Sequence, residues 1–183
     1  MITVLFGGGR EQSNTATLTE QVLEGQDYRW INLEDVVVSS SSEQAEDDAN
    51  GQKEYEQVTD QIFASEDVIL VSPVCWYSIS MTMQHFIEQW SEALEASQYE
   101  NFKEKLSDIN FRLILIGGDS PRVKALPCVQ QVDYSLQFLG AHLQDYLIGC
   151  ATQPGDIFKD TYAMNEAARW NEQYTASVAT SAN

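Results

Sequence analysis

A glycine-rich stretch near the amino terminus has the composition of a phosphate-binding loop. It follows the apolar run 2–6 and reads Gly7-Gly8-Gly9-Arg10-Glu11-Gln12-Ser13-Asn14-Thr15. Glycines let the backbone turn tightly and approach a ligand closely. The start of a helix would add N–H groups and the positive end of a dipole, and Arg10, Ser13, Asn14 and Thr15 would add side-chain donors. These residues alone leave two interpretations equally open: phosphate binding, or an ordinary strand-to-helix turn with Ser13 as N-cap.

A second unusual loop follows the apolar run 67–72 and combines aromatic with hydroxyl side chains. Its residues are Pro73-Val74-Cys75-Trp76-Tyr77-Ser78. Trp76 and Tyr77 can pack beside a flat ring, and backbone N–H groups can reach the ring's carbonyl oxygens and nitrogens. The simpler alternative is that these aromatic residues cover the core or an oligomer interface. A third candidate loop begins at Gly117-Gly118, after the apolar run 110–116.

Five apolar segments alternate with segments of helical periodicity, and together they must position these loops. The predicted strands are 2–6, 28–33, 67–72, 110–116 and 143–148. The predicted helices are 14–24, 55–63, 79–94, 129–139 and 158–174, followed by a frayed tail over 175–183. This alternation predicts a single α/β domain over 1–183, with a doubly wound five-stranded parallel sheet and helices on both faces. Ligands bind such sheets beyond the carboxyl ends of the strands, so the loops near Gly7, Pro73 and Gly117 should carry the chemistry.

Composition and charge exclude several classes of partner. The 183 residues include 10 Lys plus Arg and 28 Asp plus Glu, which gives a formal net charge of −18. Such a charge disfavours nucleic acid and anionic membrane surfaces. The apolar runs are far shorter than the roughly 20 residues of a membrane-spanning helix. Three widely spaced cysteines without a CxxC pair predict neither a disulfide framework nor a metal site. We expect a soluble, cytoplasmic protein.

Two motifs about 60 residues apart, GGGREQSNT and SPVCWYSISMTMQHFIEQW, are far more specific as a pair than either is alone. Together they resemble the flavodoxin-like NAD(P)H-dependent FMN reductase family. That family typically reads GSPR-x-x-SNT after its first strand and SPVYW-x-x-S-x-x-x-K-x-FIDR at its third. The resemblance covers roughly residues 1–150 and implies the strand order 2-1-3-4-5.

The resemblance implies that FMN binds at the strand ends. The phosphate would be held by Arg10, Ser13, Asn14 and Thr15. The isoalloxazine would be lined by Pro73, Val74, Cys75, Trp76, Tyr77 and Ser78, partly through backbone groups, and Gly117 and Gly118 match the glycines of the family's third loop. A reduced nicotinamide of NAD(P)H would pass hydride to the flavin, and a quinone, a nitro or azo compound or free flavin would accept it. Because the cofactor carries this chemistry, Tyr77 and Ser78 are only modest candidates for a catalytic role.

Several positions depart from the family pattern. Gly8 and Gly9 replace the usual Ser-Pro, and Cys75 replaces a common Tyr. Gln84 and Gln89 replace a Lys and an Arg. The polar segment 39–52 stands where some relatives carry a cysteine-rich insert, which excludes an iron–sulfur branch. The connection over 34–52 is also long enough to act as a lid.

Two other functions remain open on the same fold: an acidic electron carrier of flavodoxin type, and a flavin-free interaction module. Arg122 and Lys124 are candidate ligands for a nucleotide phosphate or a substrate carboxylate. Trp90 and Leu94 extend the helical stripe of 79–94 and suggest a homodimer face. We expect Cys75 to be a small buried hydrophobe rather than a nucleophile, because no basic residue is near it in the sequence.

Overall fold

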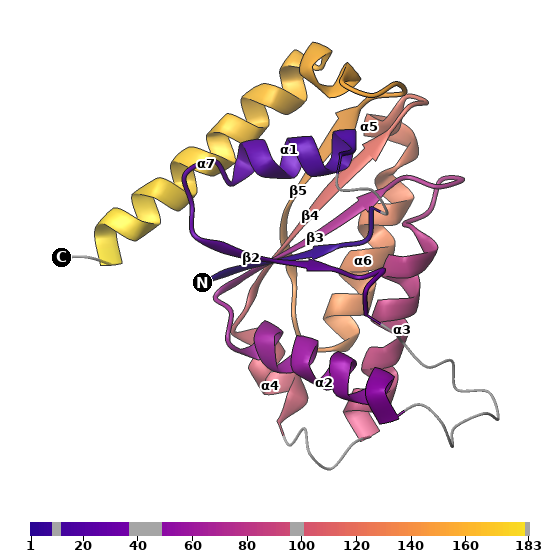
Figure 1. Cartoon of the computed structure of the whole chain (residues 1–183), viewed down its shortest axis with the longest axis vertical. Helices are drawn as coiled ribbons and strands as arrows, with labels where there is room; N and C mark the ends of the chain where they lie inside the picture. Colours follow the sequence, from indigo (N-terminus) through magenta and orange to yellow (C-terminus); the bar gives the residue numbers. More distant parts are fainter. Residues whose placement is uncertain (9–11, 37–48, 96–100, 182–183) are drawn as a thin grey trace.

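Five parallel strands form one sheet in the order β2-β1-β3-β4-β5. The structure is a computed structural model that describes residues 1–8, 12–36, 49–95 and 101–181 (Figure 1). The strands are β1 Ile2–Phe6, β2 Tyr28–Asn32, β3 Asp67–Pro73, β4 Asn110–Gly117 and β5 Leu143–Cys150. All neighbouring strands pair in parallel. The predicted sheet and its strand order are therefore confirmed.

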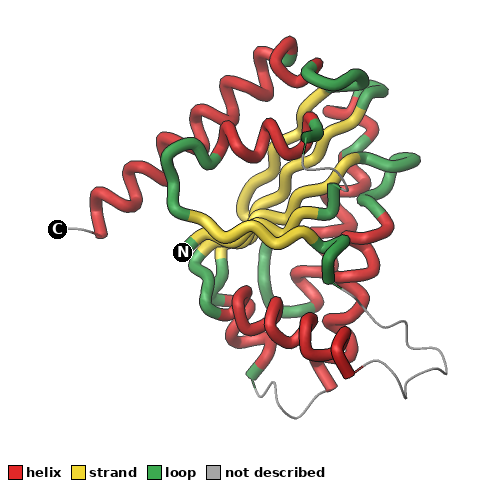
Figure 2. The backbone as a smooth tube through the Cα atoms, in the orientation of Figure 1, coloured by secondary structure: helices red, strands yellow, loops and turns green. Residues whose placement is uncertain are grey.

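Helices cover both faces of this sheet, as Figures 1 and 2 show. On one face lie α1 Asn14–Val22 and α7 Thr161–Ser181. On the other lie α2 Ala49–Phe63, α3 Met81–Glu95, α4 Phe102–Ser107 and α6 Leu126–Phe138. The short helix α5 Pro121–Lys124 follows β4, and the 3-10 helix η2 Asp156–Lys159 follows β5.

Alternating side chains along the strands build two separate cores. Leu5 of β1 and Leu70 of β3 belong to the core beneath α2, α3, α4 and α6. Their neighbours Val4 and Ile69 belong to the core beneath α1 and α7. The central strands are apolar at successive positions because both of their faces are buried.

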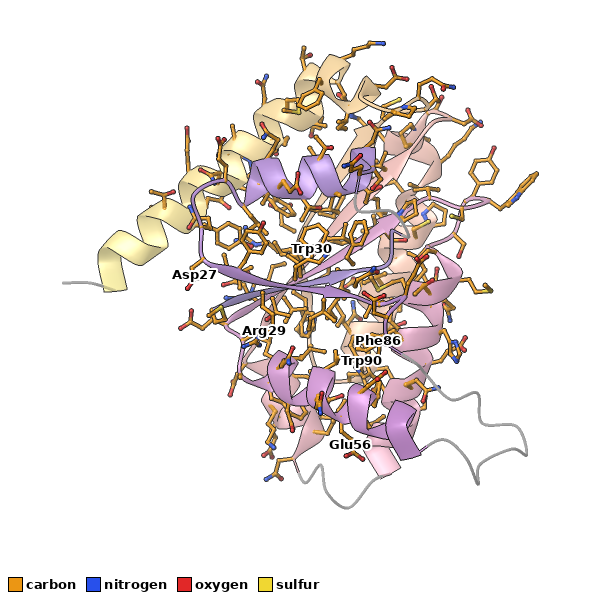
Figure 3. All side chains as sticks on the ribbon, in the orientation of Figure 1. Asp27, Arg29, Trp30, Glu56, Phe86 and Trp90 are labelled. Carbon is orange, nitrogen blue, oxygen red and sulfur yellow. The ribbon has the colours of Figure 1, made fainter. Side chains whose placement is uncertain are left out.

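Aromatic side chains fill the space between α3 and the sheet. Phe86 and Trp90 of α3 point toward the sheet (Figure 3). Phe86 packs against Tyr55 of α2 with ring centroids 5.5 Å apart, and the ring of Trp90 lies 6.5 Å from that of Phe111 in β4. Trp90 is only 1% exposed, and Leu94 packs against the same core. Trp90 therefore packs chiefly into the core over β4, and the dimer face suggested for Trp90 and Leu94 stays a prediction.

Some helix boundaries differ from those predicted from the sequence. α7 begins at Thr161, because Phe158 belongs to η2, and it continues to Ser181 beyond the predicted end at Tyr174. No glycine or proline interrupts residues 175–181, so the sequence contains no signal that stops the helix there. α4 was not predicted, because its six residues are too few to show a helical period.

Two further findings concern membranes and metals. None of the helices in the described ranges is both long and apolar enough to cross a bilayer. Among the same residues there is no cluster of three or more side chains that could hold a metal ion.

Candidate functional site

The carboxyl ends of β1, β3 and β4 lie side by side, and we call this side of the sheet the carboxyl edge. The N–H of Gly7 donates to the carbonyl of Val71 at 2.8 Å, and the N–H of Val74 donates to the carbonyl of Ile116 at 2.7 Å. The loops that follow these three strands therefore begin next to one another. The sequence predicts this meeting point, and the sheet register confirms it.

The beginning of the first loop has no room for side chains at its glycines. A Cβ on Gly7 would lie 2.9 Å from Oγ of Ser80. A Cβ on Gly8 would lie 2.3 Å from the ring of Phe6. The family's serine at position 8 therefore does not fit beside this phenylalanine. Arg10, the predicted phosphate ligand in this loop, lies outside the described residues.

The start of α1 presents backbone groups more than hydroxyl groups. Ser13 is the N-cap, and its Oγ accepts a hydrogen bond from the N–H of Ala16 at 3.2 Å. Thr15 is buried, and its carbonyl accepts a hydrogen bond from Oγ1 of Thr19 at 2.9 Å. The first N–H groups of an α-helix have no partner inside the helix and attract anions. An anion at this end would therefore be bound chiefly by the backbone.

Asn14, another predicted phosphate ligand, uses its side chain to hold the loop that follows β5. Its Nδ2 donates to the carbonyl of Gln153 at 2.8 Å. Its Oδ1 accepts from the N–H groups of Gly155 at 2.9 Å and Ile157 at 3.3 Å. Three hydrogen bonds thus join the start of α1 to the segment 151–160. In this structure Asn14 positions a neighbouring loop rather than offering its amide to a ligand.

The second loop makes a tight and strained turn between β3 and α3. Cys75 and Ser78 pair with each other: the N–H of Cys75 donates at 2.8 Å and the N–H of Ser78 at 3.0 Å. Trp76 and Tyr77 form the turn with φ values of 50° and 64°. Turns with two positive φ values favour Asn-Gly, and each bulky residue there costs about 1–2 kcal/mol. Strain of this size is common where a side chain is held ready for a ligand.

A network of three side chains joins this turn to the loop that follows β4. The hydroxyl of Tyr77 donates to Oδ2 of Asp119 at 2.8 Å. Nζ of Lys124 pairs with the same oxygen at 2.5 Å and lies 5.6 Å from the centre of the Tyr77 ring. Two hydrogen bonds lower the pKa of Asp119: the one from Lys124 has the larger effect, and the one from Tyr77 the smaller. The bond to Asp119 in turn raises the pKa of Tyr77, so its hydroxyl stays protonated at neutral pH.

A hollow of about 200 Å³ opens between these two loops. Its lining residues are Val74, Trp76, Tyr77, Gly117, Gly118, Asp119, Pro121, Lys124 and Ala125. Three of them, Val74, Trp76 and Tyr77, belong to the predicted ring-binding set, and Gly117 and Gly118 are the predicted glycines of the third loop. The remaining predicted ring contacts, Pro73 at the end of β3 and Cys75 and Ser78 in the turn, do not line the hollow. Trp76 is 95% exposed at its mouth. A mostly apolar hollow with a few polar groups suits a flat aromatic ligand.

The glycines on the β4 side of this hollow are packed closely against their neighbours. A Cβ on Gly117 would lie 3.1 Å from Cβ of Pro121 and 3.2 Å from Cβ of Val74. A Cβ on Gly118 would lie 2.5 Å from Cγ2 of Thr152, in the loop that follows β5. The third loop is therefore packed closely on both sides, and a ligand in the hollow would meet backbone there.

The loop that follows β5 forms a fourth element of the carboxyl edge, and sequence analysis missed it. Asp156 accepts hydrogen bonds from the N–H of Gln153 at 2.8 Å and from Nζ of Lys159 at 2.7 Å. Asp160 accepts from the N–H of Cys150 at 2.7 Å and is also paired with Arg122. The sequence signal for this loop was the turn-forming run Gln153-Pro154-Gly155-Asp156.

Two cysteines near the turn have different environments. Cys75 is exposed, contrary to the expectation of a buried hydrophobe, because the turn projects from the sheet. Cys128 is buried, and its Sγ donates to the carbonyl of Tyr77 at 3.2 Å. Burial raises the pKa of the Cys128 thiol, which keeps it protonated and unreactive.

Comparisons with known proteins agree with this architecture. A family model described as the flavodoxin-like fold matches residues 2–173. YwqN of Bacillus subtilis (strain 168), named as an NAD(P)H-dependent FMN-containing oxidoreductase, is 31% identical over 173 residues, or 92% of this chain and 94% of YwqN. The structure of Trp repressor binding protein from Bacillus subtilis is 29% identical, with a TM-score of 0.79 over 93% of this chain and 96% of that one.

A more distant structure shares the fold alone. The FMN-dependent NADH-azoreductase from Bacillus anthracis str. Ames Ancestor, solved in complex with FMN, is 11% identical, with a TM-score of 0.68 over 94% of this chain and 99% of that one. The family match spans the whole sheet and both loop motifs. The chain therefore belongs to the flavodoxin-like family.

Proposed function

We propose that this chain is an FMN-dependent NAD(P)H oxidoreductase that binds the flavin at the carboxyl edge. The observation that carries the proposal is the hollow between the strained turn of Trp76 and Tyr77 and the glycines that follow β4. Its position beyond the strand ends is where ligands bind doubly wound sheets. The relative YwqN, named as an NAD(P)H-dependent FMN-containing oxidoreductase, supports the same activity.

The residues on both sides of the hollow fit a flavin mononucleotide. Trp76, Tyr77 and Val74 offer apolar surface to a planar ring, and the close packing at Gly117 and Gly118 brings backbone to the opposite side. The hollow of about 200 Å³ is smaller than the 300–1,000 Å³ of typical ligand pockets. It would therefore hold the ring, while the phosphate would extend to the first N–H groups of α1 and to Arg10.

Bound FMN supplies the redox chemistry, since it accepts hydride from a nicotinamide and reduces an acceptor in turn. The protein has to bind and orient the ring and keep one side of it open. Asp119 and Lys124 hold the phenol of Tyr77 in place, because both contact it from the β4 side. Trp76, 95% exposed at the mouth, offers a flat surface to a planar acceptor. This favours quinones, nitro or azo compounds, or free flavin as acceptors.

The proposal includes a homodimer. Its support is a groove of about 370 Å³ between α3 and α6. Tyr134 and Phe138 border this groove and are largely exposed. Large exposed aromatic side chains beside a groove are typical of interfaces. Sedimentation equilibrium should give twice the monomer mass, and Phe138→Asp should shift it toward the monomer.

The visible spectrum of the purified protein tests the activity most directly. We expect yellow protein, or colourless protein that quenches FMN fluorescence on titration, and we expect released flavin to contain phosphate. Stopped-flow mixing with NADH or NADPH should then bleach the flavin absorbance in a single two-electron phase. Trp76→Ala should slow reduction of the acceptor, whereas Glu172→Ala, on the exposed side of α7, should not.

Two outcomes would favour other functions. The formal net charge of −18 also suits an electron carrier that docks on basic partners. A stable one-electron form without nucleotide oxidation would indicate such a carrier. Protein that neither contains nor binds FMN would indicate a flavin-free interaction module on this fold.

A further inference from the structure

A buried thiol of α6 contacts the strained turn between β3 and α3. Cys128 lies in the first turn of α6 and is fully buried. Its Sγ donates to the carbonyl of Tyr77 at 3.2 Å, although the two residues are 51 positions apart in the sequence. The redox activity proposed above does not use this thiol. Any effect of Cys128 on the site must therefore be exerted through the turn.

The turn is closed by its own backbone but is not oriented by it. The N–H groups of Cys75 and Ser78 each donate to the carbonyl of the other residue. Trp76 and Tyr77 between them have positive φ values, which are unfavourable for residues with a Cβ. Hydrogen bonds inside the turn do not determine where it lies relative to the sheet. Contacts from outside the turn have to hold it there and offset the strain.

The two ends of the loop are fixed close to the sheet. At the β3 end, the N–H of Val74 donates to the carbonyl of Ile116 at 2.7 Å. At the α3 end, the N–H of Ser80 donates to Oγ of Ser72 at 2.8 Å, and Ser72 is fully buried. The strained residues lie between these two fixed points and project from the sheet, so they need support of their own.

Two side chains of other elements provide hydrogen bonds to Tyr77. Its hydroxyl donates to Asp119 at 2.8 Å, and its carbonyl accepts from Cys128 at 3.2 Å. The side chain of Asp119 is 57% exposed, so water competes with that bond. The thiol of Cys128 is buried, where a hydrogen bond is less weakened by solvent. Asp119 therefore restrains the end of the ring weakly, and Cys128 restrains the backbone from which the ring projects.

The thiol is in the protonation state that this contact requires. Burial raises the pKa of Cys128, so the sulfur keeps its hydrogen at neutral pH. A protonated thiol donates to the carbonyl of Tyr77, whereas a thiolate would repel the carbonyl oxygen. A thiol is a weak donor, but this one is directed at a residue whose ring lines the hollow.

Resting on the proposed function, which places the flavin ring in this hollow, we propose that Cys128 is a positioning residue for flavin binding. By donating to the carbonyl of Tyr77, its thiol holds the turn in the conformation that receives the ring. Cys128 does not line the hollow itself, so it acts through Tyr77.

A pair of variants that differ by one hydroxyl group isolates this hydrogen bond. Cys128→Ser keeps a donor and Cys128→Ala removes it, while both side chains are smaller than that of cysteine. Fluorescence titration should give a Kd for FMN about two- to fivefold higher for Cys128→Ala than for Cys128→Ser, as expected for a weak hydrogen bond. Equal Kd values, or tighter binding by Cys128→Ala, would overturn the inference.

Val132→Ala separates positioning from a general loss of stability. Val132 is buried one turn further along α6 and does not line the hollow. Its truncation leaves a cavity and should destabilise the protein at least as much as Cys128→Ala, yet the Kd for FMN should stay unchanged. An equal rise in Kd in both variants would show that Cys128 acts through overall stability, which would overturn its assignment as a positioning residue.

Hydrogen exchange in the FMN-free protein measures the turn directly. The N–H groups of Cys75 and Ser78 should exchange faster in Cys128→Ala than in Cys128→Ser, because they close the turn. Unchanged exchange would overturn the inference and leave the proposed function intact. If the unaltered protein binds no FMN, the proposed function fails, and Cys128 then has no flavin to position.

Discussion

Two loops of the carboxyl edge are stabilised in opposite ways. The turn between β3 and α3 places two aromatic residues at positive φ and exposes one of them almost completely. The segment 151–160 is held by side chains whose oxygens accept backbone hydrogen bonds: Asn14, Asp156 and Asp160. The turn between β3 and α3 carries strain at the mouth of the hollow. The segment 151–160 has few polar groups left for a ligand and supports its neighbours.

This contrast separates residues that contact a ligand from residues that support those contacts. Support residues should affect the free energy of unfolding strongly when they are changed. Contact residues should affect binding and turnover, and a strained one should stabilise the free protein when it is replaced. The following changes test this division, from the largest expected effect to the smallest.

Asp160→Ala should have the largest effect on stability. The side chain is only 7% exposed and bonds the N–H groups of Cys150 and Ala163 together with Arg122. Its loss should lower the free energy of unfolding by about 2–3 kcal/mol, because buried donors lose a charged acceptor. Urea denaturation measures this. Glu172→Ala, exposed on α7, which begins directly after Asp160, should change stability by less than about 0.5 kcal/mol.

The contribution of Asp160 should also depend on pH. Its folded-state pKa lies below the unfolded value of about 3.9. The stabilisation by the ionised carboxylate is therefore complete at pH values above the unfolded-state pKa. It is lost as the pH falls through the lower, folded-state pKa. Urea midpoints measured from neutral pH down to about pH 3 should fall more steeply for the unaltered protein than for Asp160→Ala. Parallel curves would show that Asp160 does not titrate in this way.

Asn14→Ala should destabilise the protein by about 1–2 kcal/mol, since three partly exposed hydrogen bonds are lost. The N–H groups of Gly155 and Ile157 should then exchange faster with deuterium. Asn14→Asp keeps the acceptor for both and should preserve most of their protection. If Asn14→Ala weakens FMN binding without changing this exchange, Asn14 contacts the ligand after all.

Trp76→Gly should stabilise the free protein by about 1 kcal/mol, because glycine adopts a positive φ without strain and the exposed ring contributes little packing. Turnover should fall. Trp76→Ala removes the same ring but keeps the strain, so it should lose turnover without the gain in stability. Thermal unfolding of the two variants distinguishes strain relief from loss of the ring.

Tyr77→Phe should have the smallest effect on stability, below about 0.5 kcal/mol, because its hydroxyl pairs with an exposed carboxylate. The change should be visible instead as faster reduction of the acceptor or as an altered KM for the acceptor, because the Tyr77 ring is no longer hydrogen-bonded to Asp119. A loss of stability as large as that of Asn14→Ala would place Tyr77 among the support residues.

The sheet and the meeting point of its loops could be predicted from the sequence, because both follow from regular patterns. Buried parallel strands are continuous apolar runs, and their carboxyl ends must share one edge. The turn at Trp76 and Tyr77 was located correctly for the same reason. Its strained conformation was not foreseen, since nothing in the residue types favours a positive φ there.

The partners of charged and polar side chains could not be predicted. Arg122 and Lys124 were recognised as cations near the site, but their carboxylates Asp160 and Asp119 depend on how loops fold against one another. Asn14 matched a phosphate-binding motif, yet its three partners lie about 140 positions away in the sequence. Contacts between distant loops leave no local period for a sequence reading to detect.

The close approach of the Phe6 ring to Gly8 predicts that these two positions covary. The ring of Phe6 lies 4.8 Å from that of Trp30 and occupies the space that a side chain at position 8 would need. A smaller residue at position 6 would admit a serine at position 8 but leave a void beside Trp30. Grafting the family's loop sequence into this chain therefore requires a matching change in the interior, and homologues with a hydroxyl at position 8 should carry a smaller side chain at position 6.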